Sequence, residues 1–130
     1  MHHSAIWDEI NTALHAALRQ GLDQLDETDL TERSDNLLAS LPVVGNQQPT
    51  TALLFRRYQT TLQQELCSGR QPRMSYASPE DALRDLTRAV VVTLDTSEGI
   101  SVENAVLMAL ILHKRGLAAF CTQPALTPQV

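Results

Sequence analysis

The sequence predicts an all-α protein, a bundle of four to five helices around a buried helix near the C-terminus. The first observation is the segment Val102–Leu112, in which nine of eleven residues are apolar. A helix that is apolar on every side cannot face water, and exposing it would cost on the order of 10 kcal/mol. The second is that several other segments repeat apolar residues at helical spacing, between plausible helix caps.

The first element is a long N-terminal helix, predicted over residues 5–26 with an interruption at Gly21. Its apolar residues fall on one face at helical spacing. They are Ile6, Trp7, Ile10, Ala13, Leu14, Ala17, Leu18, Leu22 and Leu25. A short second helix is expected to follow, capped by Thr31 or Ser34 and ended by Pro42.

The third helix is predicted to open with Pro49 at its first position and to end near Cys67. Its stripe repeats every four residues, at Leu54, Tyr58, Leu62 and Leu66. The fourth is expected to start at Ser78-Pro79-Glu80-Asp81, which offers a cap, a proline and two acids. It should reach Leu94 and stop before Gly99.

The one ambiguous segment is Ala89–Leu94, whose β-branched run also suits a buried strand, so an α+β fold is the alternative. We favour a helix because Leu83, Leu86, Ala89 and Val90 continue the helical stripe. The apolar helix then runs from a Ser101 cap to Lys114-Arg115-Gly116, with an extra turn at 117–121. Residues 1–121 are thus predicted to form a single helical domain, and residues 122–130 a C-terminal tail.

Charge is unevenly distributed along the chain. The net charge is −5, with eight acids against two arginines in residues 1–48 and four arginines against one acid in residues 49–77. An acidic N-terminal part followed by a basic middle part favours self-association or packing within the chain. It does not indicate a general affinity for nucleic acid or membranes. The acidic, amphipathic N-terminus does not resemble a secretory signal, and the apolar run is too short to span a membrane, so we expect a cytoplasmic protein.

The residues that carry metal or redox chemistry form no recognisable pattern. Cys67 and Cys121 lack a pairing pattern, and we expect buried structural thiols. His15 is expected to edge a buried face, and His113 to occupy the last turn of a helix, where a positive imidazole is favoured. The start Met1-His2-His3 can wrap Cu(II) or Ni(II), but such binding is usually adventitious. We therefore predict no catalytic residue, metal or cofactor.

The favoured hypothesis is a non-enzymatic protein–protein interaction module (an adaptor, regulatory subunit or binding inhibitor) that self-associates, for example as a dimer. The apolar helix surface, the charge asymmetry and the missing catalytic motifs all favour it. The predicted contact residues lie near the two ends of the chain: Trp7, Ile10, Leu14, Leu107, Met108 and Ile111.

Two alternatives come from other functional classes. One is a nucleic-acid-associated accessory protein that uses Arg56, Arg57, Arg70 and Arg73. The other is a small enzyme or ligand carrier with a pocket between helices, lined by Tyr58, Tyr76, His15 or a cysteine.

Overall fold

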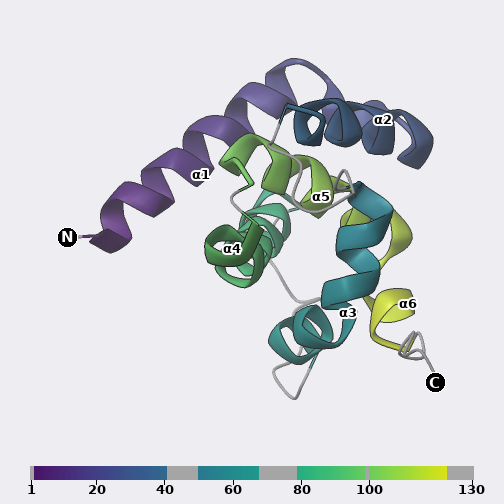
Figure 1. The fold of residues 1–130 in the computed structure, drawn as a ribbon. Helices are drawn as coiled ribbons and strands as arrows, with labels where there is room; N and C mark the ends of the chain where they lie inside the picture. The colour runs from purple at the N-terminus through teal and green to yellow at the C-terminus, as the bar shows by residue number, and fades with distance from the viewer. Residues whose placement is uncertain (1, 41–49, 68–78, 99, 123–130) are drawn as a thin grey trace.

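The computed structural model describes residues 2–40, 50–67, 79–98 and 100–122, and this part of the chain is all-α (Figure 1). Its elements are α1 (His2–Arg19), the 3-10 turn η1 (Leu22–Gln24), α2 (Glu27–Leu38), α3 (Thr51–Cys67), α4 (Pro79–Glu98), α5 (Val102–Arg115) and α6 (Leu117–Thr122). The predicted all-α class is confirmed. Residues 89–94 lie inside α4, so the alternative of a strand there is wrong.

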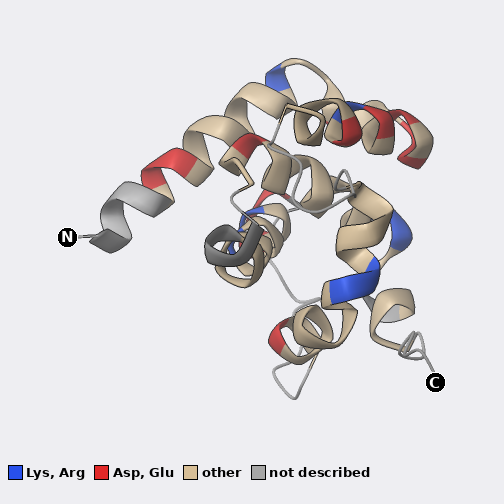
Figure 2. Cartoon of the chain, viewed as in Figure 1, with Lys and Arg blue, Asp and Glu red and all other residues tan. Residues whose placement is uncertain are grey.

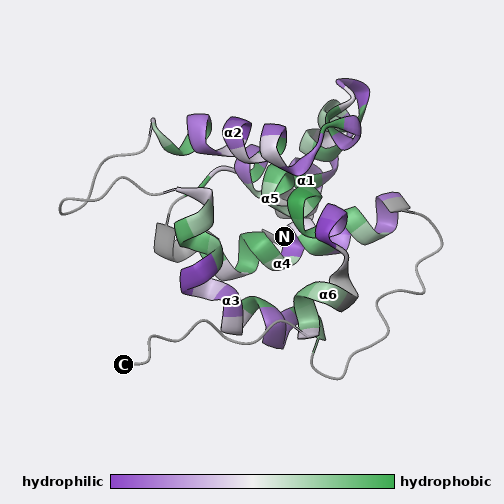
Figure 3. Cartoon of the chain, turned by 90° about the vertical axis from the view of Figure 1, so that its right-hand side faces the viewer, coloured by the Kyte–Doolittle hydropathy of each residue, from purple (hydrophilic) through white to green (hydrophobic). Residues whose placement is uncertain are grey.

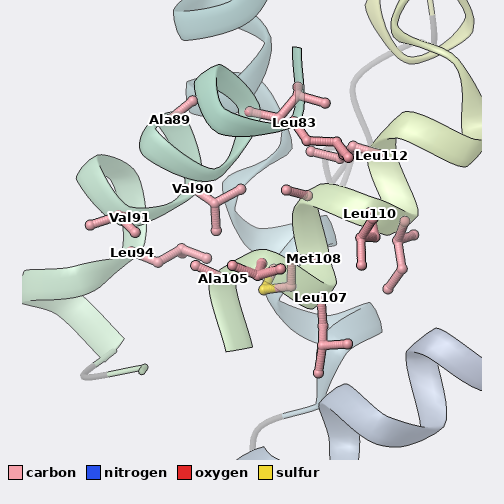
Figure 4. Close-up of a cluster of buried hydrophobic side chains, with 14 of the residues drawn as sticks. Leu83, Ala89, Val90, Val91, Leu94, Ala105, Leu107, Met108, Leu110 and Leu112 are labelled. Carbon is pink, nitrogen blue, oxygen red and sulfur yellow. The ribbon is translucent and has the colours of Figure 1, made fainter. Parts of the chain in front are cut away.

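The apolar helix α5 lies at the centre of the fold, as the sequence predicts. It packs against α1, α2, α4 and α6, and nine consecutive residues, 104–112, are buried. On one side, Val90 and Leu94 of α4 approach Ala105 and Met108 of α5 (Figure 4). Helices α1 and α2 cover another side of α5 (Figure 1). Because neighbours surround it, α5 buries residues on every face.

The buried hydrophobic residues form one cluster to which all six helices contribute. Ile10 and Leu14 of α1, Leu30 of α2 and Leu62 of α3 are completely inaccessible to solvent. Each large aliphatic side chain buried in this way stabilises the fold by about 1.5–3 kcal/mol. Figure 3 shows hydrophobic colouring on α5 at the centre and largely hydrophilic colouring on the outer helix α2.

The N-terminal segment differs from the predicted long helix. Helix α1 ends at Arg19, and Gly21 adopts a left-handed conformation with φ 75°. An L-residue with a side chain rarely adopts this conformation, and the turn redirects the chain into η1. The helix predicted over residues 5–26 is therefore confirmed up to Arg19 and wrong over residues 20–26, and the predicted interruption at Gly21 is where the chain turns.

Helix α2 also begins earlier than predicted. Its N-cap is Asp26, whose Oδ1 accepts a hydrogen bond of 2.8 Å from the Asp29 backbone N–H. The predicted caps, Thr31 and Ser34, instead lie within the helix, and Ser34 is completely buried. The cap is thus Asp26, which lies in the acid-rich stretch that precedes them, and not a hydroxyl side chain.

Most of the remaining boundaries agree with the sequence. Helix α3 ends at Cys67 as predicted but begins at Thr51, while Pro49 lies outside the described residues. Helix α4 begins at Pro79 and continues to Glu98, so it passes Leu94 and stops before Gly99 as predicted. Both predicted caps of α5 are confirmed: Ser101 Oγ accepts from the Asn104 N–H at 3.0 Å, and the C-cap Gly116 has φ 90°.

The prediction of free cysteines is wrong, because Cys67 and Cys121 form a disulfide that joins the ends of α3 and α6. The short helix α6 turns back onto α3, so that two residues 54 positions apart in the sequence meet. A second contact holds α6 there: Gln63 Nε2 donates to the Phe120 carbonyl at 2.8 Å. No local sequence pattern encodes this return, since it depends on where α6 packs.

Candidate binding groove

A groove with a volume of about 850 Å³ runs between α1 and α2 above the start of α5. Its floor is apolar and consists mainly of Ala13, Ala16, Ala17, Leu22, Leu37, Val102, Val106 and Leu107. Its rim is polar and consists of Asp8, Glu9, Thr12, Gln20, Arg33, Asn36 and Glu103. An apolar floor with a few polar groups at its edges is typical of a binding site.

The groove exists because one face of α1 carries small residues. Ala16 and Ala17 lie three and four residues after Ala13, which places all three on the same face of a helix. Their methyl groups leave space above α5 that larger side chains would fill. Along α1 the lining residues extend from Asp8 to Gln20, a length of about 18 Å or just over three helical turns.

Helices α2 and α5 form the other two walls of the groove. Helix α2 contributes Arg33 together with Asn36 and Leu37, which lie three and four residues after it. Helix α5 contributes the residues of its first two turns, with Val106 and Leu107 buried beneath the groove. These walls belong to the packed bundle, so the groove is preformed.

The charges on the rim are predominantly negative. Asp8 and Glu9 lie on α1, Glu103 lies in the first turn of α5, and Arg33 lies on α2; all four residues are exposed. Figure 2 shows the acidic positions of α1 in red, on the helix at the upper left of the view. Among the described residues, none of these four side chains forms an ion pair with another. The groove therefore presents three carboxylates and one guanidinium to an incoming ligand.

The residues predicted to form an interface belong mainly to the core. Ile10, Leu14, Met108 and Ile111 are completely buried within the single chain, and Trp7 is partly buried against the same core. Leu107 is 3% exposed and lines the floor of the groove. Their role in contacts between chains stays a prediction. The groove itself was missed, although the alanine spacing on α1 was a signal for it.

The predicted anion contacts are only partly described. Arg56 and Arg57 are exposed on α3, whereas Arg70 and Arg73 lie outside the described residues. No residue of α3 lines the groove, so the two described arginines belong to a different surface. The prediction that the four act together stays a prediction.

His15 takes part in a polar cluster that joins α1 to α4. Its Nε2 lies 2.7 Å from Glu80 Oε2, and its side chain is 55% exposed rather than packed at a buried edge. Arg84 extends the cluster: its Nε donates to Asn11 Oδ1 at 2.6 Å, and its Nη1 donates to Asp81 Oδ1 at 2.7 Å. This arrangement is a surface link between two helices.

The pocket expected for a ligand carrier is not the groove that the structure contains. Neither Tyr58, His15 nor either cysteine lines the groove, and Tyr76 lies outside the described residues. Within the described ranges, no group of three or more His, Cys, Asp or Glu residues is placed to hold a metal ion. The side chains of His2 and His3 are not among those described. His113 lies exposed in the last turn of α5, as expected.

No protein-family model, curated protein or solved structure matches this chain. In the described part of the chain, no helix has the length and apolar character needed to cross a membrane. The function is therefore inferred from the chain's own residues and their geometry.

Proposed function

We propose that this protein is a non-enzymatic interaction module, and that the groove between α1, α2 and α5 binds an apolar segment of a protein partner. The observation that carries the proposal is the continuous apolar floor of the groove, open to solvent and bordered by polar side chains along its whole length. Such a surface buries apolar area when a partner covers it, and that burial drives association.

The shape of the groove favours a helical segment. Its length of about 18 Å along α1 matches roughly twelve residues of helix. A helix that binds in this way presents apolar residues at i, i+3, i+4 and i+7. The alanines at 13, 16 and 17 allow its backbone to approach α1 closely.

Preformed walls also support binding. The groove rests on α5, whose residues 104–112 are buried in the core, so its floor needs little rearrangement to accept a ligand. A site that is already ordered loses less conformational entropy when it binds.

A photocrosslinking experiment tests the proposal. Benzoylphenylalanine is placed at Gln20, an exposed position at the end of the groove rim where it does not fill the apolar floor, and for comparison at Thr60, which is exposed on α3 away from the groove. In extracts of the native host, we expect the Gln20 position to capture one partner protein of defined mass that the Thr60 position does not capture. Identical adducts at both positions, or none at Gln20, would contradict the proposal.

The same experiment tests self-association, which the sequence analysis predicted. An adduct with twice the mass of the chain, formed by the purified protein alone at Gln20, would identify a second copy as the occupant. Sedimentation of the unlabelled protein then measures whether a dimer forms without the cross-linker.

A small molecule is the second candidate occupant, because a volume of about 850 Å³ lies within the range of small-molecule sites. A ligand that binds only the native state raises the melting temperature by mass action. A thermal-shift screen of metabolites therefore tests this candidate, with a groove-blocked variant, Thr12→Trp, as the control.

The nucleic-acid alternative is supported only by the exposure of Arg56 and Arg57 on α3. Binding through phosphate contacts weakens steeply as salt concentration rises. Absence of binding to single- and double-stranded probes at low salt would exclude this function.

The cellular location we expected from the N-terminus and the short apolar run was the cytoplasm. A disulfide between Cys67 and Cys121 argues for an oxidising compartment, since such bonds are rare in the cytosol. Differential alkylation of the two cysteines in extracts of the native host, read by mass spectrometry, decides between the two locations.

A further inference from the structure

We propose that the partner segment is an amphipathic helix of three to four turns whose polar edge carries lysine or arginine. This inference rests on the proposed function and specifies the chemistry of the partner. It follows from the charges at the groove, where Asp8, Glu9 and Glu103 border an apolar floor and Arg33 is the one cation among the lining residues.

The three carboxylates are available to a partner. All three residues are exposed, and none forms an ion pair with another described side chain. They come from two different helices, so their convergence at one groove is a property of the fold and not of a run of acids in the sequence. A basic segment would neutralise them, whereas an acidic segment would be repelled.

The carboxylates do not contribute equally. Glu103 lies in the first turn of α5, where the positive end of the helix dipole already favours its charge. Asp8 and Glu9 lie beyond the first turn of α1 and lack that compensation. We therefore expect the basic residues of the partner to lie mainly beside Asp8 and Glu9.

Charge and apolar contact have separate roles in this arrangement. An exposed ion pair contributes far less to affinity than the burial of several large apolar side chains. The floor of the groove therefore supplies most of the affinity, while the rim selects the partner and accelerates association.

The test uses a display library of 16-residue helical peptides with leucine and alanine fixed on one face and all other positions randomised. Selected on the wild-type protein, the library is expected to become enriched in lysine and arginine, and depleted of aspartate and glutamate, at the edges of the apolar face. The best peptide is then titrated by fluorescence anisotropy, and its Kd is expected to rise with ionic strength.

Two matched variants separate local charge from total charge. The double substitution Asp8→Asn/Glu9→Gln removes two charges at the groove, and we expect it to weaken the best peptide about 3- to 10-fold. The double substitution Asp29→Asn/Glu32→Gln removes the same charge from exposed positions of α2 outside the groove, and binding should stay unchanged. Equal weakening by both would overturn the proposal.

A groove-blocked variant separates this inference from the proposed function. Ala16→Trp fills the groove, and Thr12→Trp does so from an exposed edge position that leaves the core intact. If blocking abolishes binding but the selected peptides show no preference for basic residues, the charge inference is wrong and the groove remains a docking site. If peptides bind equally well after blocking, or if none is selected, both proposals are wrong.

Discussion

The side-chain amide of Asn104 donates a hydrogen bond of 2.6 Å to Oγ of Ser34, 70 residues earlier in the chain. The Thr51 hydroxyl donates to the same oxygen at 2.7 Å. All three side chains are buried, and they come from α5, α2 and α3. Because a buried polar group is stable only when it is hydrogen-bonded, this junction fixes how the three helices are positioned against one another.

Replacing Ser34 by alanine should therefore destabilise the fold. The substitution removes the Ser34 oxygen that accepts both hydrogen bonds. The Asn104 amide and the Thr51 hydroxyl then lose this hydrogen-bond partner while they remain buried. We expect the free energy of unfolding to fall by about 1–3 kcal/mol, measured by urea denaturation. Thr28→Ala, at an exposed position of the same helix, should change it by less than about 0.5 kcal/mol. A Ser34→Ala protein as stable as the wild type would show that the junction is unimportant.

Reduction of the disulfide should lower stability without abolishing the fold. The bond closes a loop between residues 54 apart, and cross-links of this size stabilise proteins by about 2–4 kcal/mol. We expect the urea midpoint of the wild type to fall when a phosphine reductant is added. The variant Cys67→Ala/Cys121→Ala should show the lower midpoint in both conditions, and any response of this variant to the reductant would count against the disulfide as the cause.

Arg115 makes two surface contacts that we expect to contribute little. Its Nε donates to Glu27 Oε2 at 2.9 Å, and its guanidinium lies 5.1 Å from the centre of the Phe55 ring. Both partners of the ion pair are at least a third exposed, so solvent screens the interaction. Arg115→Ala should lower the free energy of unfolding by about 1 kcal/mol or less in thermal denaturation. A loss above about 2 kcal/mol would mean that the two contacts act as a unit.

The two described glycines with positive φ should differ in their tolerance of alanine. Gly21 has φ 75° and ψ 21°, close to the left-handed helical region, whereas Gly116 has φ 90° and ψ 126°, outside it. A Cβ at either position would meet no atom within 4 Å, so any cost is conformational. We expect Gly21→Ala to lose about 1–2 kcal/mol and Gly116→Ala to lose more, by calorimetry. The reverse order would refute this explanation.

The sequence predicts the architecture because its strongest signals are local. The apolar run of α5, the Ser101 cap and the Ser78-Pro79 start each act within a few residues, and helices form where they indicate. The ambiguous valines of α4 are helical because Val90 and Val91 pack into the core on one face while Val92 stays exposed on the other.

The groove and the disulfide could not be predicted from the sequence because both depend on tertiary packing. The groove results from alanines on α1 that lie opposite Leu37 of α2 and above Val106 of α5, and no single segment contains that arrangement. The disulfide likewise requires α6 to return to α3. The residues predicted to form an interface lie mainly in the core instead. The periodicity of apolar residues predicts that a side chain is buried, but it does not predict whether the same chain or another chain covers it.

The bond between Cys67 and Cys121 makes a covalent ring of the chain that contains all of α4 and α5. A protease that cuts once between these two cysteines therefore leaves the two fragments attached to each other. The helix at the centre of the bundle cannot be lost through such a nick, and the cleaved protein migrates as one species on a denaturing gel until a reductant separates it into two.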